Sequence, residues 1–306
     1  MAERCSQPET ANIGRQTATT GKICWLASYP RSGNTWLRTL LANYQADGDR
    51  PVDINTLRSP GAAARGLFDE WVGLEASALD ADTIDNLRPA VYRCAAREET
   101  GLVFVKVHDM FRRNNLGQVL FPREASAGAV YIVRNVLDVA LSLAQHAGVH
   151  AIGAVEMLCD PCCAISRSEG KLDDQLRQVL GSWSGHISSW LDQTEMPVHC
   201  VRYERLLDDP MEVFASVVRF CGLPFDEDRL RRAVQFSSFS ELRRQECAHG
   251  FRERPEYSSA PFFCRGEAGR GARDLPRQLS QRLIEAHGAM LRRFDYLPES
   301  HSICGK

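Results

Sequence analysis

A short polar segment, residues 29–35, holds several side chains that bind anions well. It follows an apolar run at residues 23–27, typical of a buried strand, and precedes apolar residues at helical spacing from Trp36 to Tyr44. A loop between a strand and a helix brings free backbone N–H groups and the positive end of the helix dipole to one point. Such a point binds phosphate, and Arg31 adds a charged planar fork. Three further residues add short donors: Ser32, Asn34 and Thr35.

The same segment has a plainer interpretation, because every α/β protein contains structural turns between strands and helices. It also differs from the P-loop pattern GxxxxGK[ST], since Gly33 is its single glycine and no lysine precedes Thr35. The sequence therefore predicts a P-loop-like turn that does not bind ATP in the usual way.

Two more reactive side chains stand at the end of a second predicted strand, residues 102–107. Lys106 and His108 are two positions apart and so share one face of that strand. A lysine in an apolar strand is costly unless a charged group meets it. The alternative is an edge strand whose lysine and histidine reach solvent. We favour a functional pair, because open α/β sheets bind ligands at the carboxyl ends of their strands.

A third predicted strand, residues 129–134, also leads into a helix, which Asn135 can cap. Arg134 at the strand end and Ser142 two turns into the helix can address one anion, although Arg134 could instead pair with Asp138. A later glycine-rich and basic segment, residues 262–271, is a second candidate for phosphate binding. Its alternative interpretation is an exposed loop.

The composition, 44% hydrophobic and 25% charged over 306 residues, suits a globular α/β chain. With a fourth strand at residues 197–203, we predict one domain with a central four- to five-stranded parallel sheet flanked by helices. We place this domain at residues 21–298, between a flexible arm (1–20) and a C-terminal tail (299–306). Predicted helices cover residues 79–97, kinked or split at Pro89, and residues 182–191, 211–220, 226–236, 239–245 and 276–294.

The charge and the cysteines exclude several classes of function. A net charge of −2 argues against a nucleic-acid coat and against an anionic membrane surface. No apolar run approaches 18 residues and no signal peptide is evident, so we expect a cytoplasmic protein. The eleven cysteines are then reduced thiols. The cluster at residues 159–163 contains one CxxC without a second pair, which favours a loop with free thiols over a metal site.

Taken together, these segments resemble the PAPS-dependent sulfotransferases of the cytosolic type, particularly bacterial members; PAPS is 3′-phosphoadenosine 5′-phosphosulfate. Residues 29–36 resemble the family's 5′-phosphosulfate loop, and residues 134–142 resemble its 3′-phosphate motif. Residues 201–210 are similar to the segment whose tyrosine approaches adenine. The other similar segments are residues 181–186, a helix opening; residues 237–239, around the base; and residues 263–269, a loop over the 3′-phosphate.

The resemblance implies transfer of a sulfuryl group from PAPS to the hydroxyl of a small alcohol or phenol, with release of PAP and no metal. It implies that His108, whose ordinary pKa is about 6.5, is the general base. Arg31 and Lys106 would stabilise the moving group. A homodimer is a family-level expectation. The implied PAPS-binding residues are Arg31, Ser32, Gly33, Asn34, Thr35, Trp36, Arg134, Ser142, Tyr203, Ser237, Phe239, Arg265 and Gly266.

Two positions depart from the family pattern. The family usually has lysine where Arg31 stands, and arginine-lysine where Cys264 and Arg265 stand. All but four of the 37 basic residues here are arginine, so we expect Arg31 to act by charge rather than as a proton donor. Cys264 removes one donor to the 3′-phosphate, which predicts weaker affinity, with Arg265 and the Gly266 amide remaining.

Two other functions stay open at this point. One is a nucleotide or small-molecule kinase with an aberrant P-loop, against which stand the missing GKT and the lack of an evident Mg²⁺ carboxylate. The other is an inactive PAP-binding module, against which stands the Lys106–His108 pair.

Overall fold

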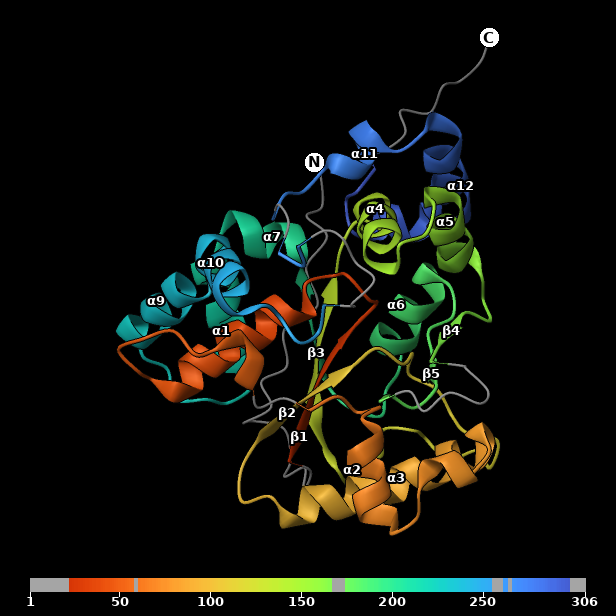
Figure 1. Ribbon diagram of the computed structural model, residues 1–306, viewed down its shortest axis with the longest axis vertical. Coiled ribbons are helices and arrows are strands. Elements are labelled where there is room, and N and C mark those ends of the chain that lie inside the picture. The colour runs from red at the N-terminus through yellow and green to blue at the C-terminus, as the bar shows by residue number, and fades with distance from the viewer. Residues whose placement is uncertain (1–21, 58–59, 167–173, 255–260, 264–265, 298–306) are drawn as a thin grey trace, which may run out of the picture.

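Four parallel strands form one sheet through the middle of the molecule, in the order β2-β1-β3-β6 (Figure 1). The structure is a computed structural model that describes residues 22–57, 60–166, 174–254, 261–263 and 266–297. The predicted arm (1–20) and tail (299–306) lie outside these ranges, as do Cys264 and Arg265. The strands are β1 (Ile23–Ser28), β2 (Val103–Val107), β3 (Ser126–Val133) and β6 (Val198–Arg202).

Helices cover both faces of this sheet. Their bounds are α1 (Asn34–Ala46), α2 (Arg65–Val72), α3 (Ala81–Glu98), α4 (Val136–Ala147), α5 (Ala151–Cys159), α6 (Trp183–Leu191), α7 (Tyr203–Asp208), α8 (Pro210–Phe220), α9 (Glu227–Phe236), α10 (Phe239–His249), α11 (Arg270–Asp274) and α12 (Arg277–Arg293). Two short 3₁₀ helices lie between the first of these: η1 (Ile54–Thr56) between α1 and α2, and η2 (Ala76–Ala78) between α2 and α3.

Alternate residues of β1 point into different layers, as the period of a strand requires. Trp25 and Ala27 pack in a core with residues of α3, α4, α5, α6 and α12. Cys24 and Leu26 pack in a second core with residues of α1, α8 and α9. All six residues of β1 are buried, which explains why this strand is a continuous apolar run.

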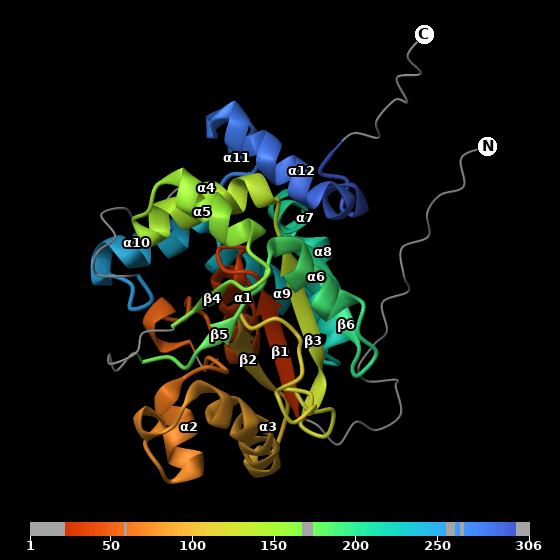
Figure 2. The same ribbon diagram turned by 90° about the vertical axis from the view of Figure 1, so that its right-hand side faces the viewer.

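Figure 2, in which the four strands lie side by side, shows α2 and α3 at one end of the sheet and α4, α11 and α12 at the other. The predicted α/β class with a four- to five-stranded parallel sheet is confirmed, with four strands in the described part of the chain. None of the described helices is both long enough and apolar enough to span a bilayer.

Pro89 lies inside α3, which runs unbroken from Ala81 to Glu98. The prediction that the proline splits the helix is therefore wrong. Proline has no N–H, so the carbonyl of Asp85, four residues earlier, loses its helical partner. The side-chain amide of Asn114 donates to that carbonyl at 3.3 Å and replaces the missing bond. Asp80 caps the start of the helix by accepting from the Thr83 amide at 2.8 Å.

Several elements of the fold were not predicted. The predicted helix ranges include neither α2 nor α5. Two short antiparallel strands, β4 (Ala164–Ile165) and β5 (Gln178–Val179), pair with each other outside the main sheet. They are two residues each, too short to leave an alternating pattern in the sequence.

Three buried histidines should make the fold sensitive to acid. Burial lowers the pKa of His186, His199 and His287 to about 4 each. Between about pH 6.5 and pH 4 these histidines are therefore protonated in the unfolded chain but neutral in the folded protein. Because the unfolded chain binds more protons, the free energy of unfolding falls as the pH falls. Each ring contributes up to about 1.4 kcal/mol per pH unit. Urea unfolding followed by tryptophan fluorescence at pH 8, 7, 6 and 5 measures this slope.

His199 offers the matched control. Its Nε2 lies 2.9 Å from the Ser216 hydroxyl, which itself donates to the Val213 carbonyl and so accepts from the ring. Glutamine can make the same donation without titrating, so His199→Gln should lower the slope by up to about 1.4 kcal/mol per pH unit. Equal unfolding free energies at pH 7 and pH 5 in the wild type would contradict the prediction.

Candidate active site

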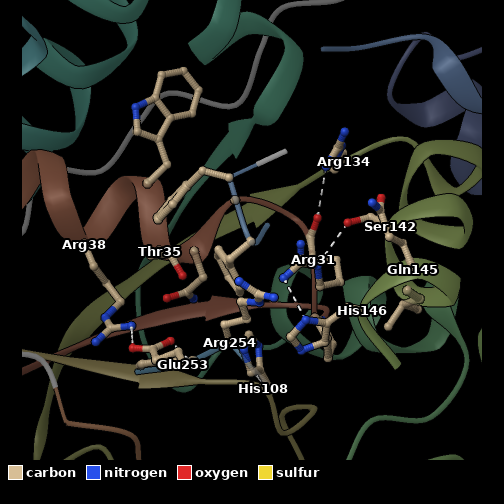
Figure 3. A pocket seen from close by; sticks show the side chains of 18 of the residues that line it. Arg31, Thr35, Arg38, His108, Arg134, Ser142, Gln145, His146, Glu253 and Arg254 are labelled. Atoms are coloured by element: carbon tan, nitrogen blue, oxygen red, sulfur yellow. Dashed lines mark hydrogen bonds and ion pairs between the residues drawn. The ribbon is translucent and has the colours of Figure 1, made fainter. Parts of the chain in front are cut away.

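A cavity of about 780 Å³ opens at the carboxyl ends of the strands (Figure 3). Its wall includes the β1–α1 turn, the ends of β2 and β3, the inner side of α4 and the start of α10. Residues 252–254, 261–263 and 266–267 also line it. Open parallel sheets bind ligands at this edge. The residues that the sequence singled out come from six separate stretches of chain, and the fold brings most of them to this one space.

The β1–α1 turn has the backbone of an anion-binding loop. Arg31 and Gly33 have φ angles of 71° and 106°, in the left-handed region, and α1 begins immediately afterwards. The Asn34 side chain donates to the Leu26 carbonyl at 2.7 Å, which ties the turn to β1. No side chain caps α1, so the amide groups of its first turn have no side-chain partner. The residues of this turn line the cavity. The Ser32 hydroxyl is buried with no hydrogen-bond partner among the described residues.

Arg31 lies toward α4 rather than along α1. Its Nε donates to the Ser142 hydroxyl at 2.9 Å, and its Nη1 lies 3.3 Å from Nδ1 of His146. Its guanidinium also lies over the Phe262 ring, 4.3 Å from the centroid. Burial, with the charges of Arg31 and Lys106, lowers the pKa of His146 to about 4, so this ring is a neutral acceptor. Arg31 thus joins the predicted 5′-phosphosulfate loop to the predicted 3′-phosphate residue.

Arg134 connects three segments of the cavity wall. Its Nη1 donates to the Arg31 carbonyl at 3.2 Å and its Nη2 to the Glu267 carbonyl at 3.0 Å. Its guanidinium stacks on the Tyr203 ring, 4.3 Å from the centroid. The Asp138 carboxylate lies 4.0 Å away, so the ion pair that the sequence left open is present but long.

Asp138 instead anchors the glycine-rich segment. Its two carboxylate oxygens accept from the Gly269 and Gly271 amides at 2.8 and 2.6 Å. A Cβ atom on Gly271 would lie 2.2 Å from the Leu137 carbonyl carbon, so only glycine allows α11 to pack this closely on α4. The segment that the sequence offered as an exposed loop is therefore fastened to α4 where the structure describes it.

Three aromatic rings gather beside the turn. Trp36 meets Tyr203 edge to face at 5.8 Å, and Phe239 lines the same part of the cavity. A Cβ atom on Gly33 would lie 2.7 Å from the Tyr203 ring, and one on Gly266 would lie 2.6 Å from the Phe239 ring. A larger residue at either position would overlap the neighbouring ring, so packing alone accounts for glycine at both.

His108 directs one ring nitrogen at β1. Its Nδ1 lies 2.9 Å from the Ser28 carbonyl, and because a carbonyl only accepts, Nδ1 carries the proton. Nε2 then keeps its lone pair, as a general base requires. Burial, followed by the charge of Lys106, lowers the pKa of His108 to about 3, well below the ordinary value of about 6.5.

The chain on either side of His108 is held firmly. The His186 ring donates through Nε2 to the His108 carbonyl at 3.0 Å. The carboxylate of Asp109, the next residue, accepts from Arg88 at 2.7 Å and from the Val179 amide at 3.0 Å. Arg88 itself is fully buried in α3. These contacts fix the backbone that carries the imidazole.

Lys106 has a partner that the sequence did not reveal. Its Nζ lies 2.9 Å from one carboxylate oxygen of Glu253, and the other oxygen lies 2.5 Å from Nη1 of Arg38 in α1 (Figure 3). No role was predicted for Glu253. None was predicted for the buried Arg38 either, although a charged residue in the first turns of an otherwise apolar helix is a signal for a buried ion pair.

Most of the predicted site residues that the structure describes line the cavity, and two do not. Ser32 and Ser237 lie behind its wall, and the Ser237 hydroxyl accepts from the Asn43 amide at 3.0 Å. Arg265 lies outside the described residues. Within the ranges that the structure describes, no three His, Cys, Asp or Glu residues are grouped as metal ligands. The lining residues that were predicted are Arg31, Gly33, Asn34, Thr35, Trp36, Lys106, His108, Arg134, Ser142, Tyr203, Phe239 and Gly266.

Comparison with known proteins adds a family to this geometry. A family model described as "Sulfotransferase domain" matches residues 22–294. Sulfotransferase 1A1 of Canis lupus familiaris is 24% identical over 253 residues, which cover 80% of this chain and 75% of the relative. Cytosolic sulfotransferase 1 of Arabidopsis thaliana is 22% identical over 265 residues, which cover 80% and 71%.

Solved structures share the fold. A retinol dehydratase, crystallised with androsterone and the inactive cofactor PAP, superposes with a TM-score of 0.58 at 19% identity and covers 92% of this chain and 84% of that one. Mouse sulfotransferase SULT7A1, crystallised with PAP, gives 0.55 at 18% identity and covers 91% and 87%. At such identities the likeness is one of fold.

Proposed function

The chain belongs to the sulfotransferase domain family, and on that premise we propose that it transfers the sulfuryl group of PAPS to a hydroxyl of a small molecule and releases PAP. One observation carries this proposal: Arg31 and Arg134 lie at one cavity with the uncapped start of α1 and the unprotonated nitrogen of His108. A nucleotide with anionic groups on both sides of its sugar fits a cavity that holds both of these basic side chains. PAP in the related crystal structures supports the same ligand.

The chemistry of the donors agrees with PAPS. The first-turn amides of α1 and the Thr35 hydroxyl would hold the 5′-phosphate, because unpaired N–H groups at a helix start bind anions. The buried Ser32 hydroxyl has no partner among the described residues and could turn toward the same group. Arg134 and Ser142 would hold the 3′-phosphate. Trp36, Tyr203 and Phe239 would enclose the adenine ring, which stacks well on aromatic side chains.

His108 would act as the general base. The acceptor oxygen forms a bond to sulfur as the bond between sulfur and the bridging phosphate oxygen breaks, and Nε2 of His108 takes the acceptor proton. A pKa of about 3 keeps the imidazole unprotonated at neutral pH, although it makes the ring a weak base. Because sulfuryl transfer resembles loose phosphoryl transfer, positioning and charge would supply most of the rate.

Arg31 and Lys106 would stabilise the transferred oxygens and the leaving phosphate. Arg31 already donates to Ser142, so its fork would bridge the two phosphate-binding ends instead of giving up a proton. An alcohol or phenol suits a neutral imidazole base. The retinol dehydratase structure contains androsterone, a small hydroxyl compound, beside PAP, which supports an acceptor of that class.

A thermal-shift comparison tests the proposal. PAP at about 100 times its dissociation constant should stabilise the protein by about 2.7 kcal/mol, or a few degrees, whereas ATP with Mg²⁺ should not. PAPS turnover against a panel of alcohols and phenols then separates an enzyme from an inactive PAP-binding module. Stabilisation by ATP with Mg²⁺ alone would favour the kinase, and PAP binding without turnover of any acceptor would favour the module.

A further inference from the structure

A carboxylate from a distant part of the chain occupies the catalytic side of the cavity. Glu253 places one oxygen 2.9 Å from Lys106 and the other 2.5 Å from Arg38. We propose that Glu253 is a positioning residue for the reaction: its carboxylate, braced by Arg38, keeps the Lys106 ammonium charged and aimed at the transferred sulfuryl group. This inference rests on the proposed function of Lys106.

The geometry explains why Lys106 needs such a partner. The Lys106 side chain is 18% exposed and projects from a strand of the central sheet, where an unpaired charge is expensive. Arg38 is 5% exposed, so both cations are withdrawn from water. One bidentate carboxylate serves both and fixes the distance between two flexible side chains.

Glu253 is carried by a well-anchored segment. Phe251, two residues earlier, is buried in a small core with Ile54, Leu242 and Phe263. The Arg252 amide donates to the Asn55 side chain at 2.8 Å, and the Arg254 amide donates to the Phe251 carbonyl at 3.0 Å. The backbone on both sides of Glu253 is therefore held, as a positioning role requires.

The charges that face Lys106 come from every element packed against it. Arg38 projects from α1 and Arg31 from the β1–α1 turn, whereas His108, at the end of the same strand as Lys106, is neutral. Segment 60–62 pairs with the Lys106 backbone and brings no charge. Burial and the two arginines lower the pKa of Lys106, whereas Glu253 raises it. Without Glu253, only groups that favour loss of the lysine proton remain.

A different role for Glu253 predicts different results. Its carboxylate could simply fill the place of the incoming anion, as an inhibitory plug that PAPS must displace. Removing a plug would raise PAP affinity and turnover and would leave the alkaline limit of activity where it was. Removing a positioning residue would lower turnover and move that limit to lower pH.

The four lysines of this chain make the test direct, because ¹³Cε-labelled lysine gives four side-chain signals and the one lost in Lys106→Ala belongs to Lys106. In Glu253→Gln the titration midpoint of this signal should fall by about one pH unit or more, since a nearby opposite charge shifts a pKa by that amount. Glu253→Asp should keep most of the wild-type midpoint. Glu212→Gln removes a surface carboxylate paired with Arg205 and should change nothing.

PAPS turnover with 1-butanol, whose hydroxyl does not titrate in this range, supplies the catalytic measurement. In Glu253→Gln, kcat should fall at least about tenfold and its alkaline limb should move with the NMR midpoint. An unchanged Lys106 midpoint, or a rise in turnover, would overturn the inference. If the wild type turns over no acceptor at all, the proposed function fails, while the NMR midpoint still decides whether Glu253 controls the charge of Lys106.

Discussion

Replacing His108 with alanine is expected to lower kcat by about two to four orders of magnitude, the usual contribution of a general base. The reason is the single unprotonated nitrogen that the bond from Nδ1 to Ser28 leaves facing the cavity. PAP affinity should stay within about twofold of the wild type, because no predicted phosphate contact involves this ring. Steady-state PAPS turnover and PAP titration calorimetry measure the two quantities separately.

The pH profile of the wild type gives a second measure of the same residue. With a pKa of about 3, His108 is neutral throughout the physiological range, so kcat should show no acid limb near pH 6.5. His150, an exposed histidine at the start of α5, offers the control, and His150→Ala should leave kcat unchanged. Turnover near the wild-type level in His108→Ala would show that another group accepts the proton.

Replacing Arg134 with alanine is expected to weaken PAP binding about 100-fold, as the loss of a charge-assisted hydrogen bond of a few kcal/mol implies. The side chain would hold the 3′-phosphate and already joins the Arg31 and Glu267 carbonyls over the Tyr203 ring. Its removal would take away a charge and also loosen the two walls of that end of the cavity. Calorimetric titration with PAP measures the change.

Two further variants show whether geometry or charge is responsible. Arg134→Lys keeps the charge but cannot reach both carbonyls with one planar fork, so it should recover only part of the affinity. Arg219→Ala removes another arginine stacked on an aromatic ring, that of Phe225, on the exposed side of α8, and should not affect PAP binding. PAP affinity in Arg134→Ala equal to that of the wild type would remove this residue from the site.

The sequence predicted the parts of this protein that depend on neighbours in the chain. The apolar runs gave the four strands, and the position of Arg31 and Gly33 between strand and helix gave the turn. Asn135 was identified as a helix cap because a cap acts within three residues. The site residues near strand ends could be expected for a different reason, because the fold class alone brings the carboxyl ends of parallel strands together.

Contacts between distant residues could not be predicted in this way. Glu253 meets Lys106 across 147 positions, and no local pattern marks a glutamate in an irregular segment as the partner of a lysine in a strand. The rescue of Pro89 by Asn114 likewise depends on a loop whose position follows only from the finished fold. The direction of Arg31, toward Ser142, depends on where α4 packs.

The contacts of Arg134 and Asp138 also join an early part of the chain to a late one. Arg134 binds a carbonyl in the β1–α1 turn and another at Glu267, and Asp138 holds the amides of Gly269 and Gly271. The phosphate end of the cavity is thus a junction at which an early, a middle and a late part of the sequence meet. A chain truncated before residue 266 would lose one wall of that site, and a ligand bound there would draw all three parts together against unfolding.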